Sequence, residues 1–173
     1  FNEFDSLYKD LEFIDREFHK NKLGVVSFAS KAKTKDNKGN YSEEYIRTRF
    51  IYGLIKSEAF PKENLCIEFH IPKGNNGKSI KPDIVAFKNS KWLTTYQSAK
   101  ANKDFSKIRQ ILLVIFETKK DNKSISDAIE NQLRSAMAEN ESKERIFGVY
   151  FDDKTEILLF KKIGNSPIRR LNE

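Results

Sequence analysis

The stretch ILLVIFETKK, Ile111 to Lys120, carries the strongest strand signal of the chain and decides how the rest is arranged. Its continuous apolar run is typical of a central strand buried on both faces. We predict a strand over Ile111–Lys119. Because side chains two residues apart on a strand leave the same face, Glu117 and Lys119 are expected side by side at its end. A buried strand would therefore deliver a carboxylate and an ammonium to one place.

A second stretch, GNNGKSIKPDIVAF, begins like a phosphate-binding loop with Gly-Lys-Ser at positions 77–79. The loop motif needs a glycine where Pro72 stands, and a helix must follow it. Here Pro82 and a strand predicted over Asp83–Phe87 follow instead. We interpret residues 73–79 as a hairpin loop. This loop would place Asp83 at the start of a strand. If that strand pairs with the strand of Glu117, the two carboxylates come within reach of each other.

These side chains could form a metal-dependent hydrolytic site. Two carboxylates hold Mg²⁺ through oxygen, and a nearby lysine can orient a metal-bound water for attack on a phosphodiester. Each piece alone has a simpler explanation: Pro82-Asp83 is common turn chemistry, and Glu117 with Lys119 is an ordinary ion pair. Their combination, followed by a helix, favours a site.

Hydrophobic periodicity and turn residues predict the remaining elements. The first part of the chain is expected to form a helix over Glu3–Lys20, an extended segment over Leu23–Ser30 and a polar loop over Lys31–Asn40. A helix capped by Ser42 and running to about Glu58 follows, and then a half-buried strand over Leu65–Ile71 with Glu68 and His70 on its outer face. After a polar insertion of uncertain structure over Lys88–Gln110, we expect a helix over Ser124–Glu139 and strands over Ile146–Phe151 and Thr155–Lys161 around a turn at 152–154. This order predicts one mixed α/β domain with a central sheet.

The composition of the chain indicates what kind of partner it binds and in which cellular compartment it works. The chain has 173 residues, a net charge of +7 and a pI near 9.3, which favours a polyanionic partner. Cys66 is the only cysteine, so neither an internal disulfide nor a cysteine-based zinc site is expected. We expect a cytoplasmic protein without signal peptide or membrane span. Since the first residue is Phe1, we expect a piece of a longer chain.

The motif Pro82-Asp83…Glu117-Thr118-Lys119 resembles that of the PD-(D/E)xK nuclease superfamily. The stretch SEEYIRTRFIYGLIKSEAFPKENLCIEFHI, followed by KPDIVAF and VIFETKK, resembles the N-terminal nuclease domain of type I restriction enzyme R subunits. The resemblance covers about Ser42 to Phe160. It implies a restriction-endonuclease-like core over 42–160, preceded by an N-terminal helix and basic loop over 1–41 and followed by a C-terminal tail over 161–173.

The resemblance also implies roles for individual residues. Asp83 and Glu117 would bind Mg²⁺, with Mn²⁺ as a substitute, and Lys119 would position the attacking water. Glu44 would approach the metal or serve only the helix dipole. Arg47 would contact phosphate or pair with a neighbouring glutamate. Gln132 would contact DNA or be an ordinary surface residue of its helix. Glu68 matches a glutamate of the family and is expected on an exposed strand face rather than in a catalytic role. Ala136 stands where the family often has a tyrosine.

The activity implied is that of an endodeoxyribonuclease: Mg²⁺-dependent hydrolysis of double-stranded DNA. ATP would act only through motor domains outside this sequence, and the full-length protein would assemble with modification and specificity subunits. Two alternatives stay open. One is a nuclease-fold module that binds DNA without cleaving it, and the other is a nuclease of another restriction or repair system.

Overall fold

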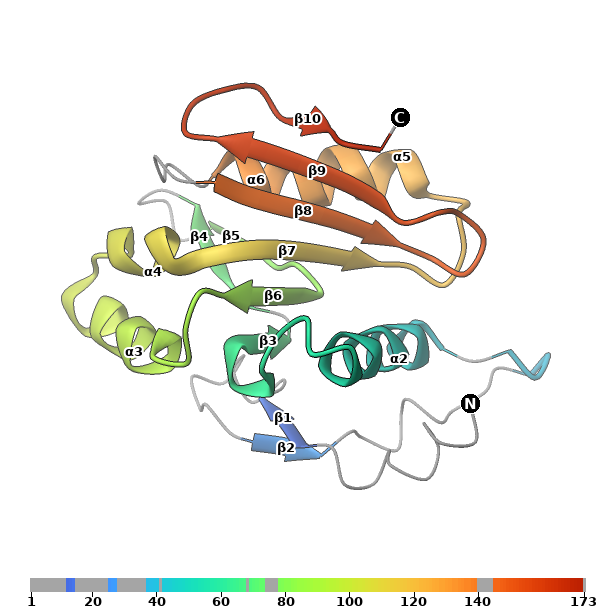
Figure 1. The fold of residues 1–173 in the computed structure, drawn as a ribbon, viewed down its shortest axis with the longest axis horizontal. Helices are drawn as coiled ribbons and strands as arrows, with labels where there is room; N and C mark the ends of the chain where they lie inside the picture. Colours follow the sequence, from blue (N-terminus) through green and yellow to red (C-terminus); the bar gives the residue numbers. More distant parts are fainter. Residues whose placement is uncertain are drawn as a thin grey trace.

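The fold is mixed α/β with a central sheet, as predicted; this sheet has six strands and is flanked by helices (Figure 1). The computed structural model describes residues 12–14, 25–27, 37–40, 42–67, 69–73, 78–139 and 145–172. The sheet order is β10-β9-β8-β7-β6-β3, in which β7 and β8 are parallel and the other neighbours antiparallel. The strands are β3 (Leu65–Ile67), β6 (Ile84–Phe87), β7 (Leu112–Thr118), β8 (Arg145–Phe151), β9 (Leu158–Ile163) and β10 (Arg169–Arg170).

One face of the sheet is covered by helix α2 (Glu43–Lys56). Ile51 of α2 is fully buried in a cluster with Ile84 and Phe116 of the sheet. Phe50 makes an edge contact with Phe116, with 5.5 Å between ring centroids. Alternate residues of β6 and β7 therefore anchor α2 to this face.

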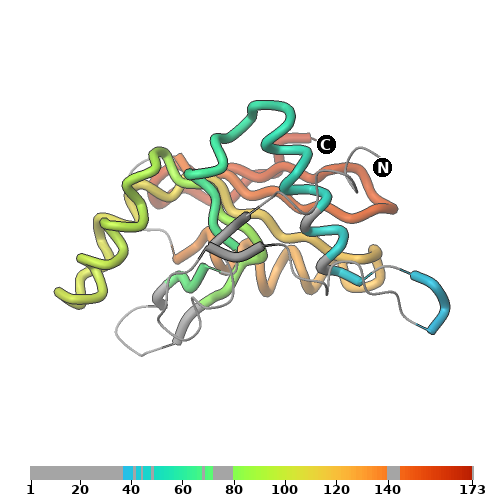
Figure 2. Tube along the Cα trace, turned by 90° about the horizontal axis from the view of Figure 1, so that it is seen from below, coloured from blue at the N-terminus to red at the C-terminus, as the bar shows by residue number. Residues whose placement is uncertain are grey.

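The opposite face is covered by the crossover helix between the parallel strands β7 and β8. It comprises α5 (Ile125–Asp127), a π-helical segment η5 (Ala128–Arg134) and α6 (Ser135–Ala138), and it lies behind the strands in Figure 1 and below the strand layer in Figure 2. Leu133 and Met137 are fully buried against β8. At the C-terminal end of α6, Nζ of Lys162 on β9 donates a hydrogen bond to the Ala138 carbonyl at 3.1 Å.

The insertion between β6 and β7 folds as two helices, α3 (Trp92–Asn102) and α4 (Ser106–Ile111), at the left end of the sheet in Figure 1. Trp92 and Tyr96 lie one helical turn apart and are both buried. The Trp92 ring stacks on Phe87 at 4.8 Å, and its indole N–H donates to the Glu63 carbonyl at 2.8 Å. The aromatic side chains of this polar stretch thus fasten it to the sheet.

Most of the predicted elements are confirmed. β7 lies between β6 and β8 and is buried over nearly its whole length. The α2 helix begins after Ser42, although the Ser42 side chain makes no capping hydrogen bond. The turn after β8 is held by Asp152, whose Oδ1 accepts hydrogen bonds from the backbone N–H groups of Lys154 and Thr155.

Two elements expected in the N-terminal half differ in the structure. The expected helix over Glu3–Lys20 contains a strand, β1 (Glu12–Ile14), which pairs with β2 (Val25–Ser27); the flanking residues lie outside the part described. The expected single strand over Leu65–Ile71 is two strands in different sheets. β3 follows a 3₁₀ turn, η4 (Lys62–Asn64), while β4 (Ile71–Lys73) pairs with β5 (Lys78–Ile80).

The physical reason for the second error is burial. All three residues of β3, including Cys66, are buried, because helices cover both faces of the sheet. The alternation of apolar and polar residues along Leu65–Ile71 therefore does not reflect a strand with one face in solvent. Burial also raises the pKa of the Cys66 thiol. The predicted hairpin over 73–79 is supported by the β4–β5 pairing, while residues 74–77 lie outside the description.

The segment 161–173, expected as a tail, contributes the end of β9 and the edge strand β10. None of the described helices is long and apolar enough to cross a membrane.

Candidate active site

Three segments that are distant in sequence meet at the right-hand edge of the sheet in Figure 1. They are the carboxyl end of β7, the start of β6 and the first turn of α2. Since Ile84 pairs with Phe116 in the antiparallel register of β6 and β7, the preceding Asp83 comes opposite Glu117. The strand pairing expected from the sequence therefore brings the two carboxylates to one place.

Asp83 is held by the end of β7. Its Oδ2 accepts hydrogen bonds from the Thr118 backbone N–H at 2.7 Å and from the Thr118 hydroxyl at 3.0 Å. Its Oδ1 lies 3.8 Å from the Arg47 guanidinium. Burial raises the pKa of Asp83, and the nearby Lys119 and Arg47 only partly offset that rise. The neighbours of Asp83 thus fix the direction in which this carboxylate points.

Glu117 is the most buried acidic group of the cluster, with a side chain that is only 2% exposed. Its Oε1 lies 2.5 Å from Nζ of Lys119. Burial and the negative charge of Asp83 raise the pKa of Glu117 to about 8, against the opposing effect of Lys119. Two like charges in a desolvated place repel each other unless a cation or a proton intervenes.

Lys119 lies between two carboxylates. Besides Glu117, its Nζ contacts Oε1 of Glu43 at 3.2 Å. Burial by itself lowers the pKa of Lys119, but Asp83, Glu117 and Glu43 together outweigh burial and raise it. The lysine is therefore an ammonium across the whole physiological range, able to donate hydrogen bonds but not to accept a proton.

Two residues of this cluster were not predicted from the sequence. Glu43 of α2 contacts Lys119, and the side chain of the candidate Glu44 lies outside the described part of the chain. The available signal was the spacing of Glu43 and Arg47, which are four residues apart and so share a helix face. Thr118 was overlooked because a threonine inside a strand carries no signal of its own.

The other candidates are not brought to this cluster by any described contact. Gln132 lies on η5, where its side-chain amide is 3.5 Å from Asp127 of the same helix. Glu68 lies outside the described residues. Ala136, at the position where the nuclease family that the sequence resembles often has a tyrosine, is fully buried.

The donor chemistry of the cluster suits a hard divalent cation. Asp83 and Glu117 offer carboxylate oxygens, the ligands that Mg²⁺ and Mn²⁺ prefer. Their mutual repulsion in a buried position is the electrostatic condition that such a cation relieves. Over the described ranges, no group of three or more His, Cys, Asp or Glu side chains has a metal-binding arrangement. A cation there would rest on two carboxylates and complete its shell with other oxygens.

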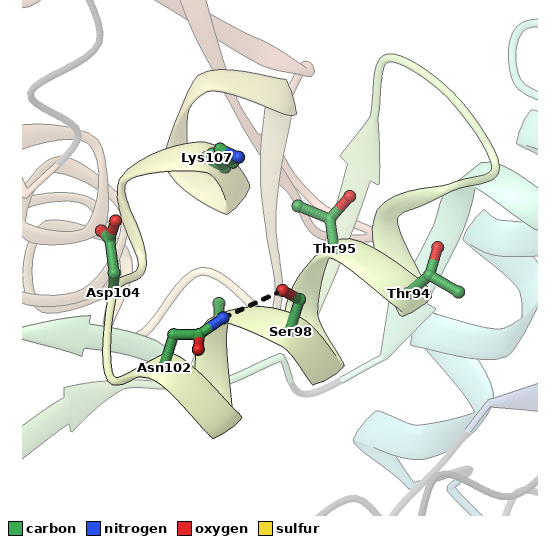
Figure 3. Close-up of a pocket in the computed structure, with 7 residues that line it drawn as sticks. Thr94, Thr95, Ser98, Asn102, Asp104 and Lys107 are labelled. Atoms are coloured by element: carbon green, nitrogen blue, oxygen red, sulfur yellow. Dashed lines mark hydrogen bonds between the residues drawn. The ribbon is translucent and has the colours of Figure 1, made fainter.

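A pocket of about 330 Å³ lies elsewhere, between α3 and α4 at the opposite end of the sheet (Figures 1 and 3). Its lining is polar and comprises Thr94, Thr95, Ser98, Ala99, Asn102, Asp104 and Lys107. Asn102 and Ser98 hydrogen-bond to each other there. It contains none of the residues of the carboxylate cluster.

Comparison of the chain with protein-family models, with curated proteins and with solved structures finds no match. The assignment of function therefore rests on the residues and their geometry.

Proposed function

We propose that the chain is a restriction-endonuclease-like domain of the PD-(D/E)xK type that hydrolyses phosphodiesters of double-stranded DNA with Mg²⁺. One observation carries the proposal: Asp83, Glu117 and Lys119 meet at the end of the central strand. They do so although 33 residues, including two helices, separate the motif halves at Asp83 and Glu117. An accidental sequence match gives no reason for its parts to meet in space.

In this proposal each residue of the cluster has a task. Asp83 and Glu117 hold the cation, which when bound neutralises developing charge and lowers the pKa of a bound water. Lys119, as a permanent ammonium, donates a hydrogen bond that orients the attacking water. Thr118 and Arg47 orient Asp83 through the contacts given above. The net charge of +7 favours a polyanionic substrate.

The finer assignment, the DNA-cleaving domain of a type I restriction enzyme R subunit, rests on the resemblance over residues 42–160. In that setting ATP-driven translocation would come from motor domains outside these residues. Modification and specificity subunits would then direct the complex to its DNA. A nuclease of another restriction or repair system would use the same cluster in the same way.

A second candidate is a nuclease-fold module that binds DNA without cleaving it. The observation in its favour is that, among the described residues, no three acidic side chains are arranged to hold one metal ion. Such a module needs no divalent cation. Replacing Asp83 or Glu117 would then leave the DNA affinity unchanged, whereas affinity would still fall with rising salt concentration.

A calorimetric titration with Mn²⁺ tests the proposed site directly. We expect the wild-type chain to bind Mn²⁺, with duplex DNA present to complete the coordination shell, and Asp83→Ala and Glu117→Ala each to abolish binding. Asp153→Ala serves as a control, because Asp153 is a surface carboxylate paired with Arg49 at 3.2 Å. Equal titrations for all four proteins would exclude the metal site.

Cleavage is then measured with the full protein and any partner subunits. Asp83→Asn and Lys119→Ala should each lower the rate at least about 100-fold, the lower range for loss of a positioned catalytic group. Lys107→Ala is the control for Lys119, because Lys107 is an exposed lysine on α4 at the opposite end of the sheet. Full activity in Lys119→Ala would contradict the role given to this lysine.

A further inference from the structure

The first turn of α2 brings two opposite charges to the carboxylate cluster, and each meets its complement. Glu43 lies 3.2 Å from the ammonium of Lys119, and Arg47 lies 3.8 Å from the carboxylate of Asp83. The two residues are one helical turn apart and share a face. One helix thus contacts both the cation and an anion of the cluster.

Lys119 is shared between partners of different character. The carboxylate of Glu117, at 2.5 Å, is almost completely buried, whereas that of Glu43, at 3.2 Å, is half exposed. A lysine ammonium is a compact charge on a flexible stem, so it can shift between two acceptors within its reach. Glu117 is the acceptor that a bound divalent cation also needs. Glu43, on a different element, is not required by that cation.

We propose that Glu43 is a positioning residue that takes over Lys119 when Glu117 binds a divalent cation. The inference rests on the proposed metal site. An ammonium and a divalent cation at one carboxylate repel each other, and this repulsion is strong where water is excluded. With Glu43 as second acceptor, Lys119 leaves Glu117 without losing its ion pair. It stays beside the cluster, where the reaction requires it. Without Glu43, Lys119 stays on Glu117 and competes with the cation.

A double-mutant cycle on the full chain tests this exchange, with the dissociation constant for Mn²⁺ as the measured quantity. Glu43→Gln should weaken Mn²⁺ binding about tenfold when Lys119 is present, a coupling of usual size between neighbouring charges. In a Lys119→Gln background, the same change should alter binding less than about threefold. Glu43→Asp should restore most of the affinity, because it keeps the carboxylate.

The matched control is Glu130→Gln, which removes an exposed carboxylate in an ion pair of similar length, 3.3 Å to Arg134, on η5. It should leave Mn²⁺ binding unchanged. Thermal unfolding of every variant checks that the first turn of α2 is intact, since Glu43 also favours that helix terminus.

The outcomes separate this inference from the proposed function. If Glu43→Gln weakens Mn²⁺ binding equally with and without Lys119, Glu43 acts only as a negative charge and the exchange is disproved. In that case the proposed site stands if Asp83→Ala and Glu117→Ala still abolish binding. If the wild-type chain binds no Mn²⁺ even with DNA, the proposed site fails and the exchange fails with it.

Discussion

At the scale of single residues, the cluster shows a conflict between burial and charge. Glu117 lies on β7, a central strand that is apolar because both of its faces are covered. Asp83 lies opposite Glu117, at the start of the neighbouring strand β6. Desolvation and like charge both oppose their joint ionisation. Such an arrangement costs stability, and strongly perturbed carboxyls of this kind occur more often at functional sites than elsewhere.

The conflict predicts how stability depends on pH when divalent cations are removed with EDTA. The pKa of Glu117 rises from 4.5 to about 8 on folding, so between these values the folded state holds a proton that the unfolded state has lost. The stabilisation from this group is complete below pH 4.5 and disappears as the pH approaches 8. We expect the unfolding free energy to fall by about 1 kcal/mol per pH unit between pH 5.5 and 7.5.

Chemical denaturation of wild type and Glu117→Gln over this pH range measures the effect. The variant cannot ionise at this position, so its unfolding free energy should depend less on pH than that of the wild type. The control is Glu130→Gln, which alters an exposed glutamate and should keep the wild-type slope. Parallel curves for wild type and Glu117→Gln would show that Glu117 titrates normally.

At the scale of elements, the sequence predicted those parts in which local pattern and tertiary position agree. β7 is an unbroken apolar run because both of its faces are covered, and α2 has a regular apolar face because one of its sides packs on the sheet. Where the environment changes within a few residues, the pattern misled. Leu65–Ile71 alternates like one strand, but the chain leaves the main sheet after Ile67 and pairs anew from Ile71.

The same limit applies to the candidate site. The pairing of Asp83 with Glu117 was predictable because it follows from two adjacent strands in antiparallel register. The contact of Glu43 with Lys119 was not predictable, because it depends on how α2 is rotated about its axis. Packing of Ile51 against the sheet sets that rotation, and only the tertiary structure reveals it.

Element packing also predicts the effect of a single methyl group at Gly148. A Cβ added there would overlap the sulfur of Met137 and lie 3.2 Å from Leu133, so the crossover helix lies directly on the β8 backbone. We expect Gly148→Ala to lower the unfolding free energy by about 1–3 kcal/mol, as overpacking of a dense core usually does. In a Met137→Ala background the same change should cost less, because the closest atom is then absent.

Thermal or denaturant unfolding of Gly148→Ala, Met137→Ala and the double variant measures that coupling. Gly53→Ala is the matched control, since a Cβ at Gly53 on the exposed side of α2 meets nothing within 4 Å. This control should be neutral or stabilising, because alanine favours a helix over glycine. Additive losses in the double variant would mean that Met137 does not limit the approach of the helix.

At the scale of the whole molecule, charge is distributed along the sheet as well as within the cluster. Exposed or partly exposed lysines border the candidate site, with Lys81 just before Asp83, and Lys120 and Lys123 just after Lys119. Others lie at the far end of the sheet on α3, α4 and the loops around them. If the site cleaves DNA, phosphates of the duplex must lie beside the lysines that border the site. They need not contact the lysines at the far end of the sheet.

This geometry predicts which lysines determine DNA affinity. Replacing Lys81, Lys120 and Lys123 by glutamine should weaken binding to a duplex of about 30 base pairs, because these side chains would neutralise phosphates beside the site. The slope of log Kd against log salt concentration should also fall, by about 0.9 for each phosphate that the protein no longer neutralises. Fluorescence anisotropy with a labelled duplex, without divalent cation, gives both quantities.

The control variant replaces Lys91, Lys103 and Lys107 at the far end, so it removes the same total charge. It should change the affinity only slightly and leave the slope as it is, because distant charges are screened within about 10 Å at 0.1 M salt. Equal effects in the two variants would mean that the protein attracts DNA by net charge alone. The end of the sheet at which Asp83 and Glu117 lie would then not be the surface that contacts the duplex.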